Sequence, residues 1–100
     1  MLVILEWRID PERATAFAQT MQPIGRARRQ TGATHWALYQ DADDPALFLE
    51  TFTVANWSEH LRQHLERGIE SDKELDTAAQ TFLTDGHGPR VRHLLSPDNG

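Results

Sequence analysis

The fold is decided by residues 38–64, which read LYQDADDPALFLETFTVANWSEHLRQH. Two runs rich in apolar, aromatic and β-branched residues flank a short turn marked by Asp44 and Pro45. This pattern predicts two strands joined as an antiparallel hairpin. Asn56 or Ser58 can then cap a helix, so the stretch reads as strand, turn, strand and helix.

Residues 2–9 form an apolar run short enough to be a strand. Asp10 and Pro11 are suited to begin a helix, and apolar residues then recur every three or four positions as far as Ile24. Pro23 should kink this helix or end it early, because proline cannot donate to the preceding turn. The strands are predicted at residues 2–9, 33–40, 46–54 and 90–95.

The second helix is predicted in two pieces, because Gly68 should end the first, and the second then covers residues 71–83. The element order is therefore β-α-β-β-α-β, which predicts an α+β, ferredoxin-like fold with a four-stranded antiparallel sheet. We expect one domain at residues 1–95 and a flexible tail at residues 96–100.

Apolar residues occupy both faces of three predicted strands, although helices can cover only one face. Within the first strand Val3, Leu5, Trp7 and Ile9 oppose Leu2 and Ile4, within the second Trp36 and Leu38 oppose Ala37 and Tyr39, and within the third Phe48 and Phe52 oppose Leu47 and Leu49. We therefore expect a homodimer in which two sheets pack face to face, as a dimeric α/β barrel. A monomer with an apolar open face is the alternative.

Composition excludes several classes of function. The formal net charge of −5 argues against a nucleic-acid-binding protein, which usually presents a basic face. The chain has no cysteine, which excludes disulfides, thiolate metal sites and cysteine nucleophiles. No apolar run approaches the ~18–20 residues of a membrane span, so we expect no membrane insertion and a cytoplasmic location.

The stretch from Gly32 to His64 resembles the antibiotic biosynthesis monooxygenase-like family of dimeric α/β barrels. It is more similar still to the soluble C-terminal domain of some major facilitator superfamily exporters. The residues that carry this resemblance are Gly32, Ala33, Thr34, Trp36, Leu38, Tyr39, Asp41, Pro45, Phe48, Glu50, Phe52 and the helix at residues 57–64.

The resemblance implies a homodimer that binds a small, flat, apolar or aromatic molecule. If the protein is an enzyme, we expect a cofactor-independent oxygenase or isomerase, and the resemblance makes Tyr39 and Trp36 counterparts in type of residues in the family's cofactor-free monooxygenases. The alternative is a non-catalytic ligand-binding or dimerisation module associated with a transporter. Haem degradation is disfavoured because residues 2–9 contain no Asn and residues 69–83 contain no His. No cofactor is expected.

His60 and His64 lie one helical turn apart, and His64 falls on the same predicted helix face as Trp57. Two histidines at this spacing can bind zinc, but the metalloprotease pattern places Glu after the first His, and here Leu61 follows. A half-buried histidine bonded to a carbonyl or carboxylate is the simpler interpretation. We therefore predict no metal site.

Glu50 lies within an apolar strand, where a carboxylate must be paired or protonated. His64 is the expected partner: it would accept a proton, Glu50 would orient it, and Tyr39 would help to shape the site. Trp36, Trp57 and His60 are the expected ligand-binding residues. A structural pair that fixes the helix on the sheet is the alternative. Arg26, Arg28 and Arg29 are interpreted as a solvated helix end.

Overall fold

The computed structural model describes residues 1–56, 58 and 70–97 of the chain. The predicted α+β, ferredoxin-like fold is confirmed. The elements are β1 (Leu2–Arg8), the 3-10 turn η1 (Pro11–Arg13), α1 (Ala14–Gln30), β2 (Thr34–Gln40), β3 (Leu47–Thr53), α3 (Glu70–Gln80) and β4 (Arg90–Leu94). α3 matches the predicted second piece of the broken helix, and the predicted first piece lies outside the described residues.

The four strands form one antiparallel sheet in the order β2-β3-β1-β4. β2 and β4 are its two edges, so these strands do not close into a barrel within one chain. The register between β2 and β3 shifts between Thr34 and Ala37. His35 lies at this bulge with a φ of 55°, a left-handed conformation that is uncommon outside glycine.

The 3-10 turn η1, which leads into α1, carries the cap that the sequence predicts for the first helix. The Asp10 Oδ1 atom accepts a hydrogen bond of 3.0 Å from the Glu12 backbone N–H, and Pro11 occupies the first turn. α1 then continues through Pro23 as far as Gln30, so the prediction that this proline ends the helix early was wrong.

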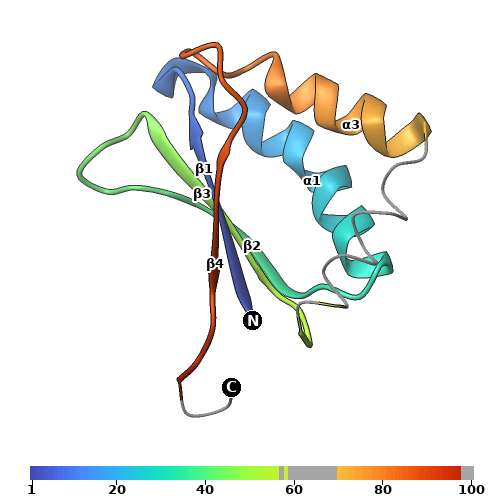
Figure 1. Ribbon diagram of the computed structural model, residues 1–100. Helices are drawn as coiled ribbons and strands as arrows, with labels where there is room; N and C mark the ends of the chain where they lie inside the picture. Colours follow the sequence, from blue (N-terminus) through green and yellow to red (C-terminus); the bar gives the residue numbers. More distant parts are fainter. Residues whose placement is uncertain (57, 59–69, 98–100) are drawn as a thin grey trace.

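Both described helices lie on the same face of the sheet, side by side (Figure 1). Phe17 of α1 is fully buried at the centre of this layer. Its ring lies 5.4 Å from the rings of Trp7 and Phe48 and 5.6 Å from the ring of Phe82. Such tilted aromatic contacts fix the helices on the sheet as well as burying apolar area.

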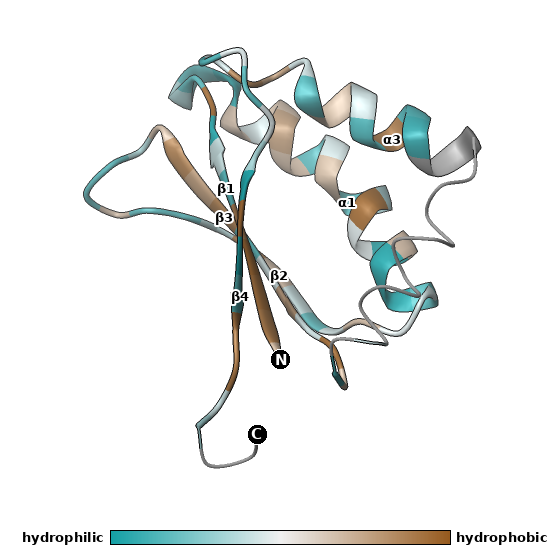
Figure 2. Ribbon diagram, in the orientation of Figure 1, coloured by the Kyte–Doolittle hydropathy of each residue, from teal (hydrophilic) through white to brown (hydrophobic). Residues whose placement is uncertain are grey.

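The opposite face of the sheet also carries apolar side chains, as predicted. Burial alternates along β1 and β3, and Leu2, Ile4, Leu47 and Leu49 are half-buried on the face that the helices leave open. Tyr39 on that face is 59% exposed. Hydrophobic colouring runs along β1 and β3 and over the lower half of β4 (Figure 2). We call this surface the open face. Whether a second copy covers it stays a prediction.

Candidate functional site

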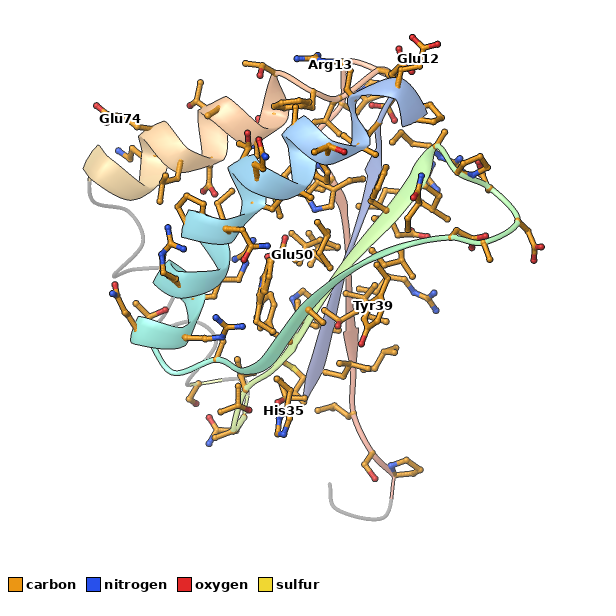
Figure 3. The ribbon with its side chains drawn as sticks, turned by 180° about the vertical axis from the view of Figure 1, so that it is seen from behind. Glu12, Arg13, His35, Tyr39, Glu50 and Glu74 are labelled. Carbon is orange, nitrogen blue, oxygen red and sulfur yellow. The ribbon has the colours of Figure 1, made fainter. Side chains whose placement is uncertain are left out.

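Glu50 is the most deeply buried charged side chain among the described residues. It lies in the middle of β3 with no exposed surface, between Leu49 and Thr51, which point to the open face. Strand alternation therefore directs Glu50 under α1. Figure 3 shows Glu50 between the sheet and this helix. A carboxylate in this position has to find its hydrogen-bond donors inside the protein.

Four N–H groups from three other elements meet the two oxygens of Glu50. Arg28 donates from Nε to Oε2 and from Nη2 to Oε1, the second bond being 3.1 Å long. The indole N–H groups of Trp7 and Trp36 donate to Oε1 and Oε2, at 3.3 and 2.9 Å. Each carboxylate oxygen thus accepts two hydrogen bonds. We call Glu50, Arg28, Trp7 and Trp36 the buried carboxylate cluster.

Arg28 reaches this cluster because it continues the buried stripe of α1. Phe17, Met21, Ile24 and Arg28 follow one another at spacings of four, three and four residues. Only 3% of Arg28 is exposed, and its guanidinium carbon lies 4.9 Å from the centre of the Phe52 ring. The interpretation of Arg28 as part of a solvated helix end was therefore wrong.

The Trp36 indole is held against α1 from two sides. An ideal Cβ built on Gly25 would lie 2.7 Å from Cδ2 and Cε3 of Trp36, so the indole occupies space that any other residue would fill. The guanidinium carbon of Arg29 lies 5.6 Å from the centre of the Trp36 ring, within reach of a cation–π contact. These contacts fix the ring so that its N–H points at Glu50.

This arrangement limits what Glu50 can do chemically. The two oxygens of Glu50 already accept four hydrogen bonds. A carboxylate has about four acceptor sites, so none remains for a substrate proton. A bidentate Arg–carboxylate pair with both oxygens further bonded is a strong positioning device. The buried carboxylate cluster therefore ties α1 to three strands of the sheet.

The expected partner of Glu50, His64, lies outside the described residues, as do His60 and Trp57. The pairing of His64 with Glu50, and the roles of all three residues, stay predictions. Arg28, Trp7 and Trp36 donate hydrogen bonds to both oxygens of Glu50. The sequence analysis assigned none of these three donors to Glu50. The signal that could have found Arg28 is its place on the apolar stripe of α1.

Tyr39 does not join the other predicted site residues. It pairs directly with Leu49 in the β2–β3 register, on the open face, while Trp36 is buried on the helix-covered face. Figure 3 shows Tyr39 on the side of the sheet away from Glu50. The expected common pocket of Trp36 and Tyr39 is therefore not formed within one chain.

A second charged arrangement lies at the end of β1. Arg8 Nη1 and Asp44 Oδ2 form an exposed ion pair at 2.5 Å, which joins β1 to the β2–β3 turn. The hydrogen bond from Arg8 holds the pKa of the Asp44 carboxyl below its usual range. The same hydrogen bond raises the pKa of Arg8. Within residues 1–56, 58 and 70–97, no three His, Asp or Glu side chains gather as a metal site would require.

Comparison with known proteins adds a family and a set of folds. A family model described as transmembrane secretion effector matches residues 1–100. No curated protein sequence matches the chain. In the part of the chain that is described, no helix has the length and apolar character needed to span a bilayer.

Several solved structures share the fold. A protein proposed to be an antibiotic biosynthesis monooxygenase, from Caulobacter crescentus CB15, superposes with a TM-score of 0.75 at 13% identity, over 93% of this chain and 85% of its own. A crystal structure of an antibiotic biosynthesis monooxygenase gives 0.73 at 17% identity, over 96% and 98%. A similarly named protein from Deinococcus radiodurans gives 0.71 at 19% identity, over 96% and 92%. At these identities the likeness establishes the fold.

Proposed function

The chain belongs to the transmembrane secretion effector family, and from that premise we propose that it is a non-catalytic dimerisation module that acts beside a membrane exporter. The observation that carries the proposal is the open face of the sheet. Its half-buried leucine and isoleucine side chains and its exposed tyrosine are apolar surface that the helices of the same chain do not cover.

The open face has the layout of a protein interface. Leu49 and Ile4 lie near its centre, where β3 and β1 are paired, and Arg90 and Arg92 lie on the β4 edge. Glu6, the register partner of Leu49, also lies on this face, so its apolar side chains are bordered by charged ones, as is typical of surfaces that bind another protein. Because the two faces of a C2 dimer are identical, one such surface suffices for a second copy of the chain.

The buried carboxylate cluster supports a structural role for the other face. Glu50 is the carboxylate expected to orient a proton-accepting histidine, and Arg28, Trp7 and Trp36 already hold it. A carboxylate held by four hydrogen-bond donors is suited to fixing the fold and is poorly suited to proton transfer.

The experiment is a measurement of molar mass by size-exclusion chromatography with light scattering. We expect about twice the 11.4 kDa mass of one chain. Leu49→Glu should give a folded monomer, because it places a charge at the centre of the open face. Ala78→Glu, on the exposed side of α3, adds the same charge and should stay dimeric. A wild-type monomer would contradict the proposal.

A second candidate is a cofactor-independent monooxygenase acting on a small aromatic or quinone-like compound. It is favoured by the fold shared with proteins named as antibiotic biosynthesis monooxygenases. In this candidate His64 accepts the proton. His64→Ala should then abolish turnover of an identified substrate and leave the melting temperature unchanged. If His64→Ala lowers the melting temperature by several degrees and the wild type shows no measurable turnover, only the dimerisation module remains.

A further inference from the structure

A cavity separate from the buried carboxylate cluster lies at the end of the open face. Its volume is about 190 Å³. Part of its wall comes from the sheet and part from the loop between α3 and β4, which passes the upper end of β4 in Figure 1. The lining residues are Glu6, Arg8, Leu47, Leu83, Asp85, Gly88 and Arg90.

Opposite charges lie side by side in the sheet wall of this cavity. Glu6 of β1 and Arg90 of β4 are direct partners in the antiparallel register, a position that brings Cβ atoms to about 4.5–5.5 Å. Yet neither side chain takes part in an ion pair or a side-chain hydrogen bond within the described residues. After Asp44, the charge of Glu6 also helps to raise the pKa of the neighbouring Arg8, while the hydrogen-bonding groups of Glu6 and Arg90 stay available to a ligand.

The other two charged residues of the wall are partly engaged. Arg8 is bonded to Asp44, and the Asp85 Oδ1 atom accepts the backbone N–H of His87 at 3.1 Å. The remaining carboxylate oxygen of Asp85 is an acceptor on the loop side of the cavity. Leu47 and Leu83 supply apolar surface between these polar groups.

The balance of charge selects the class of ligand. Two guanidinium groups and two carboxylates line the cavity, so their formal charges cancel. A simple anion would be attracted by Arg90 and repelled by Glu6, and a simple cation would experience the reverse. A molecule that carries one positive and one negative group, a few ångströms apart, is attracted at both ends.

We propose that this cavity binds a small zwitterion of the amino-acid class. Its ammonium group donates to Glu6 and Asp85, its carboxylate accepts from Arg90, and a short apolar group packs on Leu47 and Leu83. The volume equals that of roughly six liquid water molecules, which suits a ligand of leucine size. The site shares Leu47 and Arg90 with the open face, so ligand binding and dimerisation are measured separately.

The test is titration of ¹⁵N-labelled full-length protein with leucine, followed by amide chemical shifts. Two analogues each lack one charge: 4-methylpentanoate has no ammonium group, and isopentylamine has no carboxylate. We expect leucine to shift the amides around the cavity with a Kd of about 1–10 mM, a range suited to a small, open polar site. Each analogue should bind at least about tenfold more weakly, because it leaves one charged wall unpaired.

Three variants locate the binding. Glu6→Gln and Arg90→Gln should each weaken leucine binding at least about tenfold. Arg92→Gln is the matched control: Arg92 lies on the same strand and the same face, opposite Ile4, and does not line the cavity. If Glu6→Gln does not fold, Asp85→Asn, in the exposed loop, replaces it. Circular dichroism melting confirms that each variant is folded.

Three results would overturn the proposal. They are the absence of shifts at saturating leucine, equal affinity for leucine and either analogue, and equal losses in Arg92→Gln and Arg90→Gln. Light scattering of the same samples keeps the two proposals apart, since a dimer that does not bind leucine overturns only this inference. A monomer that binds leucine overturns only the dimerisation module.

Discussion

Arg28, in the last turn of α1, binds both carboxylate oxygens of Glu50, in the middle of β3, although 22 residues separate them. Both side chains are buried, at 3% and 0% exposure. Charges removed from water in this way are costly unless every donor and acceptor is satisfied, and Trp7 and Trp36 complete the set. This pair therefore fixes the last turn of α1 against the middle of the sheet.

Glu50→Gln should destabilise the fold strongly. The amide cannot neutralise Arg28, and its NH₂ group would face N–H donors that need an acceptor. Loss of one partner of a buried ion pair costs about 3–5 kcal/mol, and urea unfolding followed by tryptophan fluorescence measures it. Glu74→Gln, on the exposed side of α3, is the matched control and should change the unfolding free energy by less than about 0.5 kcal/mol. Equal unfolding free energies for Glu50→Gln and Glu74→Gln would contradict the structural role of the buried carboxylate cluster.

Replacing both charges should recover part of that loss. Arg28→Met combined with Glu50→Leu removes both partners of the buried ion pair. Replacing such a pair by apolar residues often leaves protein stability unchanged. The indole N–H groups of Trp7 and Trp36 would still lose their acceptor, at about 1–3 kcal/mol each. We therefore expect the double variant to lie between the wild type and Glu50→Leu in a double-mutant cycle. A double variant whose loss of stability equals the sum of the two single losses would rule out direct coupling.

Gly25→Ala should lower stability despite alanine's higher helix propensity. The added Cβ would lie 2.7 Å from the Trp36 indole, so the ring or the helix has to move. Overpacking of this kind costs about 1–3 kcal/mol, against a gain of about 1 kcal/mol from propensity. The control is Gly88→Ala, where an added Cβ meets nothing within 4 Å. A shift of the tryptophan emission maximum should accompany the loss of stability only in Gly25→Ala.

The Arg8–Asp44 pair predicts a defined pH dependence. The hydrogen bond from Arg8 lowers the pKa of Asp44 in the folded state, so this pair stabilises the fold above the ordinary aspartate pKa. That contribution is lost as the pH falls through the lowered pKa and Asp44 becomes protonated. The stability difference between wild type and Asp44→Asn should therefore shrink from neutral pH to about pH 2. A stability difference that grows on acidification would contradict the assignment. Added salt should reduce the stability difference at neutral pH, because both Arg8 and Asp44 are exposed.

Local patterns predicted most of the fold. The turn at Asp44-Pro45, the cap at Asp10 and the alternation along β1 all depend on residues close in sequence, and the structure confirms them. Pro23 was expected to kink the helix or to end it early, and the helix does not end there, because the loss of one backbone hydrogen bond does not end a helix whose buried stripe continues to Arg28.

The candidate site was predicted less well. Glu50 was identified as a buried carboxylate in need of a partner, because a charge in an apolar strand demands one. The partner was sought at His64, which lies outside the described residues, and among those described the structure supplies Arg28 from the helix before β2. Sequence proximity is a poor guide here, since antiparallel packing brings α1 over the middle of the sheet.

The sequence by itself determined the element order, the two apolar faces of the sheet and the absence of cysteine chemistry, because these depend on residue type and short-range spacing. Only the tertiary structure decided that Arg28 neutralises Glu50 and that Tyr39 lies on the face opposite Trp36. It also placed Glu6 and Arg90 beside one cavity. The physical reason is that strand order and register set which side chains meet, and these depend on packing across the whole domain.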